Sequence, residues 1–182
     1  MAGARGRETA WRDVGRELGR LHTMVLDCPD PHGWLDDPAA GRGYTAESLL
    51  CRLACVGEEG NGLAGPVRRL LNAGGVSPGR IFVHGDTNGG NVLCHREGGL
   101  MALIDWGDAG WADPAVDFYM VPPEGLEAAL RGYGETAPVL LTEPFLLQVL
   151  ADKIWEGLQE GVEPKQLGLQ MRDLEERLSA LL

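Results

Sequence analysis

The chain has 182 residues, of which 44% are hydrophobic and 24% charged, and it carries a formal net charge of −11. This composition is that of a folded domain with its own core, and it excludes a disordered chain, which would be poorer in core-forming residues. The sequence contains no run of about 18 apolar residues, and its first residues lack an apolar stretch, so we expect a cytoplasmic protein with no membrane partner.

The negative charge lies mainly in the second half of the chain. Residues 1–91 contain 10 basic and 11 acidic residues, whereas residues 92–182 contain 6 basic and 16 acidic ones. Without a local basic patch, such a chain is not expected to bind nucleic acid. The acidic half could attract a cationic small molecule, although a solvated acidic surface is the simpler interpretation.

The first part of the chain is predicted to be helical with long connections. Apolar residues at steps of three and four predict a helix over 9–26, and prolines end it. A loop rich in proline, glycine and aspartate is expected over 27–44. A second helix is expected over 45–56, with Thr45 as its N-cap.

A short β region is predicted in the middle of the chain. Before it, we expect a glycine-rich loop over 57–65 and a short helix from Pro66 to about residue 73. Residues 80–84 form an apolar strand pattern, and residues 91–95 and 100–105 are expected to form a hairpin. Helices are then expected over 123–133, 143–160 and 164–182, the last with a regular apolar stripe.

The four cysteines are Cys28, Cys51, Cys55 and Cys94. Cys51 and Cys55 lie about one helical turn apart, but no second close pair and no histidine cluster accompany them. We therefore expect reduced, mostly buried thiols rather than a zinc site.

Polar residues with a chemical pattern follow two of the predicted strands. Asp86 follows the first strand, Asn91 stands five positions later, and Asp105 ends the second strand of the hairpin. Phosphoryl transfer needs a group that positions a hydroxyl nucleophile and takes its proton, which an aspartate can do. It also needs hard oxygen ligands for Mg²⁺, which amide and carboxylate side chains supply. Taken alone, Asp86 and Asn91 could simply form turns. Asp105, placed where the hairpin brings it beside them, favours the chemical interpretation.

Three segments resemble the aminoglycoside phosphotransferase and choline-kinase-like family. They are HGDTNGGNVL at 84–93, IDWGDAGWADPAVDF at 104–118 and LGRLH at 18–22. The resemblance implies an α+β, mostly α-helical fold, the C-terminal lobe of a protein-kinase-like fold with a small central β-hairpin region. It also implies ATP as phosphoryl donor and direct transfer of the γ-phosphoryl group to a substrate hydroxyl.

The resemblance assigns roles to individual residues. Asp86 would be the catalytic base, and Asn91 and Asp105 would be the Mg²⁺ ligands. Asp113 and Asp117 would be structural, tying the loop after the second strand to the catalytic loop. Two histidines are also expected to be structural: His84 within the loop and His22 on the apolar face of a helix.

The sequence departs from the family in two places. Asn88, Gly89 and Gly90 stand where the family often has His-Pro-Gly, and no lysine precedes Lys153. The phosphate-binding lysine of the N-terminal lobe is therefore missing, and we expect residues 1–182 to form a single catalytic lobe without the nucleotide-binding one. The glycines at 60–67 match a kinase glycine-loop pattern, but they lie too close to Asp86 for a kinase lobe to fit between them.

Three functional hypotheses remain. The first is an ATP-dependent phosphotransferase acting on a hydroxylated small molecule, such as an aminoglycoside or another amino alcohol or sugar, represented here by its catalytic lobe. The second is a lobe of the same kind that binds a cationic small molecule without transferring phosphate. The third is a degenerate remnant of a kinase that has only a structural or partner role. In each case, an uncovered apolar face is expected to cause self-association into a homo-oligomer.

Overall fold

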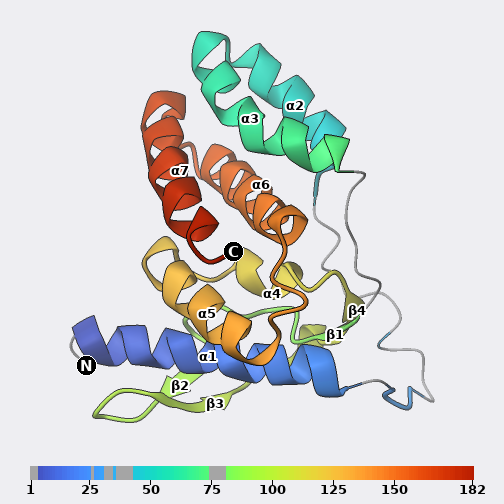
Figure 1. Cartoon of the computed structure of the whole chain (residues 1–182), viewed down its shortest axis with the longest axis vertical. Coiled ribbons are helices and arrows are strands. Elements are labelled where there is room, and N and C mark those ends of the chain that lie inside the picture. The colour runs from blue at the N-terminus through green and yellow to red at the C-terminus, as the bar shows by residue number, and fades with distance from the viewer. Residues whose placement is uncertain (1–3, 26, 31–34, 36–42, 74–80) are drawn as a thin grey trace. The chain divides into compact units, whose positions relative to one another are not determined.

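The computed structural model describes residues 4–25, 27–30, 35, 43–73 and 81–182. The helices are α1 (Ala4–Met24), α2 (Ala46–Cys55), α3 (Glu58–Asn72), α4 (Val116–Tyr119), α5 (Pro123–Thr136), α6 (Glu143–Gln159), α7 (Pro164–Ser179) and the short 3-10 helix η1 (Trp106–Asp108). The strands are β1 (Ile81–Val83), β2 (Val92–Cys94), β3 (Leu100–Leu103) and β4 (Gly110–Ala112) (Figure 1). This order confirms the predicted α+β, mostly helical fold with a central hairpin.

The chain divides into two compact units. The first is formed mainly by Met1–Ala40 and Ser77–Leu141, and it contains α1, α5 and the four strands of the described residues. The second is formed mainly by Gly41–Val76 and Thr142–Ala180, and it contains α2, α3, α6 and α7. All of the residues predicted to carry chemistry belong to the first unit.

In the first unit, α1 packs along α5 (Figure 1). A Cβ atom on Gly15 would lie 1.8 Å from the carbonyl oxygen of Ala129, and one on Gly132 would lie 1.9 Å from that of Arg12. Either side chain would therefore overlap the backbone of the other helix. Glycine at both positions allows the close approach that buries Leu18 completely.

We expect Gly15→Ala to lower the free energy of unfolding by about 1–3 kcal/mol, because the added methyl group must displace backbone atoms of α5. The matched control is Gly62→Ala on α3, where the added Cβ would meet no atom within 4 Å. Within a helix, that change should raise the free energy of unfolding by about 0.5–1 kcal/mol. Denaturant titration measures both, and equal effects would contradict the role assigned to Gly15.

The strands form two separate antiparallel pairs. β1 pairs with β4, with Phe82 opposite Trp111, and β2 pairs with β3, with Leu93 opposite Ala102. The β2–β3 pair is the predicted hairpin, and an irregularity between Leu93 and Cys94 shifts its register. β4 was not predicted, because its residues, Gly110–Ala112, include no β-branched side chain and stand shortly before Pro114.

In the second unit, α2 begins as predicted at Thr45. The Thr45 hydroxyl accepts a hydrogen bond from the backbone N–H of Ser48 at 3.2 Å, and the Thr45 N–H donates to the Ser48 hydroxyl at 2.8 Å. This reciprocal pair satisfies two N–H groups that the first turn of a helix leaves without partners.

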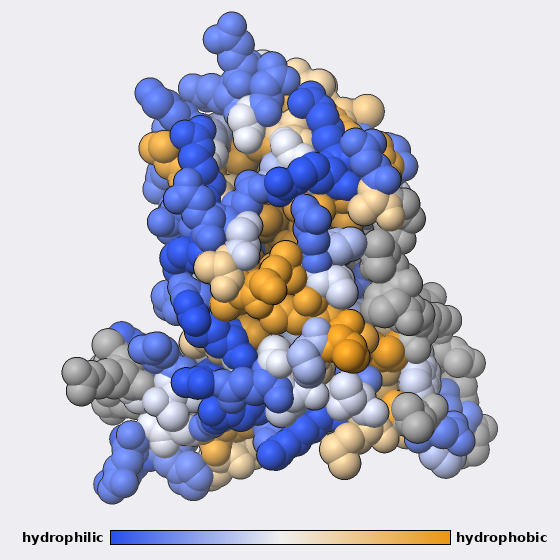
Figure 2. Space-filling view, viewed as in Figure 1, coloured by the Kyte–Doolittle hydropathy of each residue, from blue (hydrophilic) through white to orange (hydrophobic). Residues whose placement is uncertain are grey.

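The apolar stripe predicted for the last helix is confirmed in α7. Leu167, Met171, Leu174 and Leu178 are buried, and α7 packs against α3 and α6. Most side chains on its exposed face are hydrophilic (Figure 2), with Leu169 as an exposed apolar residue among them.

The glycine-rich loop predicted over 57–65 is wrong, because residues 58–65 belong to α3 and Gly57 is its N-cap. The helix runs without interruption past Pro66, and its buried face includes Gly60, Leu63 and Val67. A Cβ on Gly60 would lie 2.0 Å from the carbonyl oxygen of Leu53, so glycine is needed there for α2 and α3 to pack. A helical segment cannot fold over phosphate groups as a glycine loop does, which confirms the rejection of that interpretation.

The prediction of mostly buried thiols is also wrong. Cys51, Cys55 and Cys94 are exposed, and Cys28 is half-buried. In α2 the buried residues are Leu49 and Leu53. Cys51 and Cys55 each lie two residues after one of these leucines, which places them on the opposite side of the helix.

Two remaining expectations concern long segments. Most of the loop predicted over 27–44 lies outside the described residues, and its described part contains neither helix nor strand. Among the helices that the structure describes, none has both the length and the apolar character needed to span a bilayer.

Candidate active site

The candidate site is built on the loop that follows β1. At the start of this loop Gly85 has a φ of 87°, and a Cβ there would lie 2.1 Å from the carbonyl oxygen of Asp108. Only glycine combines this left-handed backbone with so close a neighbour. Gly85, which directly precedes Asp86, therefore lies against the backbone of Asp108 at the end of η1.

Two amide side chains hold the Asp86 carboxylate. Asn88 Nδ2 donates to Asp86 Oδ1 at 2.7 Å, and Asn91 Nδ2 donates to Asp86 Oδ2 at 2.8 Å. Asn91 Nδ2 also lies 2.9 Å from the backbone oxygen of Asp86. The carboxylate is half-buried and faces a fixed direction, while further lone pairs on both oxygens can accept a proton or a hydrogen bond.

The hairpin brings Asn91 beside Asp105. Asn91 directly precedes β2, Asp105 lies two residues after the end of β3, and the backbone N–H of Ile104 donates to the backbone oxygen of Asn91 at 3.0 Å. Asn91 is buried and Asp105 is exposed. The structure thus places all three sequence-predicted site residues around the open ends of one strand pair.

Asp105 has an unusual backbone conformation. Its φ of 62° and ψ of 70° lie in the left-handed region, and it is the only described residue other than glycine with a positive φ. Aspartate tolerates this region better than most residues, and such conformations concentrate where function requires them.

Asp117, on α4, binds the backbone of the loop that follows β1. It is fully buried, and its carboxylate accepts hydrogen bonds from the backbone N–H groups of His84 at 2.9 Å and Gly85 at 2.7 Å. The Thr87 hydroxyl lies 3.5 Å from the same carboxylate. The structural role predicted for Asp117 is therefore confirmed, while Asp113 accepts from the Ala115 N–H at the turn into α4.

A chain of buried side chains continues from Asp117 to α1 and α5. His22 Nε2 lies 2.9 Å from Asp117 Oδ2, and His22 Nδ1 lies 2.9 Å from the Tyr133 hydroxyl. Burial, and after it the charges of Asp117 and Asp113, raises the pKa of Tyr133 far above its ordinary value, so its hydroxyl stays protonated. His22 is the partnered core histidine that the sequence predicted. Tyr133 was missed, because nothing local marks a tyrosine whose partner stands 111 positions away.

His84 joins the loop to the end of β3. Its Nε2 lies 3.0 Å from the backbone oxygen of Ile104, and its Nδ1 accepts from the Asp86 N–H at 3.3 Å. These two contacts require the proton to be on Nε2, because a carbonyl oxygen can only accept. The ring also packs against Trp106, with centroids 4.5 Å apart. The predicted structural role of His84 is confirmed.

The site offers few groups to a metal ion. In the described parts of the chain, no three His, Cys, Asp or Glu side chains are arranged to hold one. Asn91 turns its Nδ2 toward Asp86, so its amide oxygen is the atom that could bind a cation, and Asp105 adds a carboxylate. Lysine is absent from the loop, and the side chain of Lys153 is buried in α6, where it pairs with Glu156 at 2.6 Å.

The following solved structures have a similar fold and low sequence identity to this chain. The ADP-bound crystal structure of the aminoglycoside phosphotransferase APH(2'')-Ib is 18% identical, with a TM-score of 0.50 over 97% of this chain and 63% of that one. The gentamicin complex of APH(2'')-IIa is 19% identical, with a TM-score of 0.45 over 92% of this chain and 62% of that one. The macrolide 2'-phosphotransferase MphH from Brachybacterium faecium is 22% identical, with a TM-score of 0.42 over 90% and 59%.

The chain thus spans about three fifths of the length of these structures. A search among curated proteins gives no significant match. The model of the phosphotransferase enzyme family matches residues 1–141, which include the whole candidate site. As its sequence motifs predicted, the chain belongs to the phosphotransferase enzyme family.

Proposed function

We propose that this chain is the catalytic lobe of a phosphotransferase that moves the γ-phosphoryl group of ATP to a hydroxyl of a small molecule. One observation carries the proposal. The amide of Asn91 orients the Asp86 carboxylate at 2.8 Å, and a hairpin hydrogen bond sets the same asparagine beside Asp105. A proton acceptor and two hard oxygen donors then lie at one place, as phosphoryl transfer requires.

In this proposal Asp86 is the catalytic base. Its carboxylate would accept the proton of the substrate hydroxyl as the oxygen attacks the γ-phosphorus, and the bond from that phosphorus to the β-phosphate oxygen breaks. Hydrogen bonds from Asn88 and Asn91 hold the carboxylate in one orientation. Such positioning is the main contribution that a protein makes to this reaction.

Asn91 and Asp105 would hold Mg²⁺. An amide oxygen and a carboxylate are hard ligands of the kind that Mg²⁺ prefers, and Mg²⁺ usually takes only one or two protein ligands beside water and phosphate oxygens. When bound, the ion supplies positive charge that neutralises the transferring phosphoryl group. The exposure of Asp105 at the end of the hairpin supports the assignment, because an ion can reach its carboxylate.

ATP as the donor rests on the similar structures, one of them an ADP-bound phosphotransferase and another a ternary complex with streptomycin and ATP. The chain adds an observation of its own. Leu93 on β2 and Ile104, directly after β3, are exposed apolar side chains near Asn91 and Asp105 in the chain, and they would suit the flat apolar face of a purine base.

The acceptor in this proposal is a hydroxylated, cationic small molecule. Proteins of similar fold have been solved with gentamicin and streptomycin, and others are macrolide phosphotransferases. The excess of 16 acidic over 6 basic residues in 92–182 would favour a cationic acceptor.

A second candidate is a lobe that binds nucleotide or substrate without transferring phosphate. The observation that favours it is the absence of any lysine before Lys153.

The same observation bears on how the chain is organised. We propose that residues 1–182 make up the catalytic lobe alone, and that a phosphate-binding lysine would come from polypeptide outside this sequence.

Calorimetric titration of this chain with ATP and Mg²⁺ tests the site. We expect Asp105→Ala to abolish Mg²⁺-dependent binding, because it removes the only charged ligand proposed for the ion. Asp108→Ala is the matched control, since Asp108 is also exposed and lies three residues away. Equal loss in both variants, or none in Asp105→Ala, would contradict the ligand assignment. An assay of ADP release in the presence of a hydroxylated amine distinguishes the two candidate functions, because only a phosphotransferase would release ADP.

A further inference from the structure

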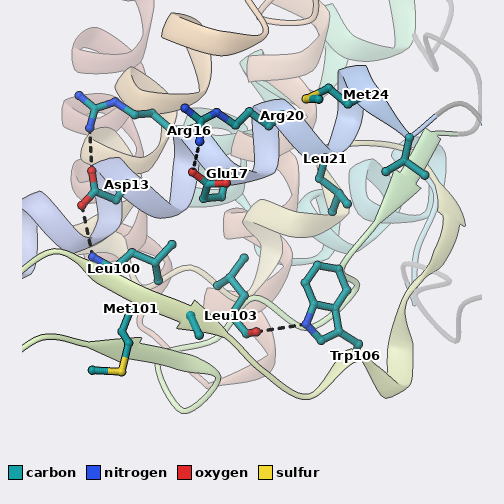
Figure 3. Close-up of a pocket in the computed structure, with 12 residues that line it drawn as sticks. Asp13, Arg16, Glu17, Arg20, Leu21, Met24, Leu100, Met101, Leu103 and Trp106 are labelled. Atoms are coloured by element: carbon teal, nitrogen blue, oxygen red, sulfur yellow. Dashed lines mark hydrogen bonds and ion pairs between the residues drawn. The ribbon is translucent and has the colours of Figure 1, made fainter.

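A groove of about 720 Å³ lies in the first unit, between α1 and β3 (Figure 3). Its floor and one wall are apolar and include Leu21, Leu100 and Leu103. Three apolar side chains along it are unusually exposed: Met24 at 75%, Met101 at 56% and Trp106 at 44%. Exposed apolar side chains gathered along one groove indicate a surface that contacts another molecule.

The other wall of the groove is a row of four charged side chains on α1, here called the charge ladder. Its members are Asp13, Arg16, Glu17 and Arg20. Spacings of three, one and three residues put all four on one face of the helix, and their signs alternate from negative to positive (Figure 3).

The charge ladder is only partly suited to a helix on its own. Arg16 pairs with Asp13, and Arg20 pairs with Glu17, each at 2.6 Å and three residues apart. At a separation of four residues, however, Asp13 faces Glu17 and Arg16 faces Arg20, and like charges at this spacing destabilise a helix. Exchanging Glu17 and Arg20 would make every one of these contacts favourable.

The same order of charges is self-complementary under a two-fold rotation. If a second α1 lies antiparallel, with the axis between Arg16 and Glu17, Asp13 faces Arg20 of the other copy and Arg16 faces its Glu17. All four pairs across the interface then join opposite charges, whereas a parallel copy in register would place like charges together. A two-fold interface requires such a self-complementary surface.

We propose that the groove and the charge ladder form the interface of a homodimer in which two α1 helices pair antiparallel. Burial of Met24 and Met101 supplies most of the affinity, and the charges select the antiparallel orientation. Glu135 of α5, which also binds Arg12 and Arg16, holds the ladder in place before the copies meet. This dimer does not depend on the proposed phosphotransfer.

Sedimentation equilibrium of the 182-residue chain, over a series of protein and salt concentrations, tests the proposal. The wild type should be a dimer that weakens as salt rises. The double variant Glu17→Arg/Arg20→Glu keeps the net charge and the pair between positions 17 and 20, but it places like charges opposite each other across the whole interface. We expect its dimer Kd to rise by about 100-fold or more.

Two further variants sharpen the test. Asp173→Arg/Arg177→Asp exchanges an exposed ion pair on α7 and should leave the dimer intact. Met24→Glu should dissociate the dimer, because it puts a charge into the apolar contact. Thermal unfolding should show the Glu17→Arg/Arg20→Glu chain to be folded. A wild type that stays monomeric at every concentration overturns the proposal, and so does a dimer that the exchange on α1 leaves unchanged.

Discussion

Replacement of Asp86 by asparagine should lower kcat by about 100- to 10,000-fold, the range that a positioned general base contributes. Asparagine keeps the size of the side chain and can still accept a hydrogen bond from the amide of Asn91. It cannot take a proton from a substrate hydroxyl at neutral pH. The variant should therefore fold and bind nucleotide as the wild type does, and fail only in transfer.

Steady-state assay of ADP release, with calorimetric titration of ATP in parallel, makes this measurement. The matched control is Asp108→Asn, which removes the same charge from an exposed position near the loop. A full kcat in Asp86→Asn would rule out Asp86 as the base. Equal losses in both variants would point instead to the overall negative charge of the site.

Asp117→Ala should lower the free energy of unfolding by about 3–5 kcal/mol, the cost of removing one partner from a buried charged network. The backbone N–H groups of His84 and Gly85 would lose their acceptor, and so would His22. None of these groups can easily reach water, because Asp117 and His22 are both buried. The loop that carries Asp86 would lose its main anchor.

Denaturant unfolding compares Asp117→Ala with Asp173→Ala, whose side chain is 70% exposed on α7. The exposed variant should change the free energy of unfolding by less than about 0.5 kcal/mol. A similarly small effect at Asp117 would mean that the loop is held by other contacts. Hydrogen exchange at the amides of His84 and Gly85 would report their release directly.

The elements that the sequence predicted well are those with a long or specific local pattern. The apolar stripe of α7 runs over about three turns, and Thr45 carries a capping signature. The pattern of Asp86, Asn91 and Asp105 was recognisable because two of its members lie in one short loop and the third ends a hairpin strand. Local spacing was enough to predict that Asp86 and Asn91 lie together and that Asp105 lies at the same end of the hairpin.

The predictions from sequence failed where contacts between different elements of the fold determine the structure. The glycines of α3 suggested a loop, yet the close contact of Gly60 with Leu53 makes glycine the residue that a helix needs there. The link between Tyr133 and His22 joins residues 111 positions apart, so no local pattern could reveal it. The left-handed backbone of Asp105 follows from its tertiary surroundings rather than from its neighbours in the chain.

The hairpin also decides which spacings in this sequence can change. Asn91 and Asp105 are set beside each other by strand pairing, and the turn between Cys94 and Leu100 lies at the far end of the strands. The strands already absorb an irregularity after Leu93. Residues inserted at the turn would therefore leave the two oxygen donors where they are.

The interval from Asp86 to Asn91 has no such freedom, because the two side chains are joined through one continuous loop whose ends are both fixed. One residue more or less there would separate the carboxylate from its amide. A search for this site in distant relatives should therefore keep the spacing from Asp86 to Asn91 constant. It should allow the spacing from Asn91 to Asp105 to vary.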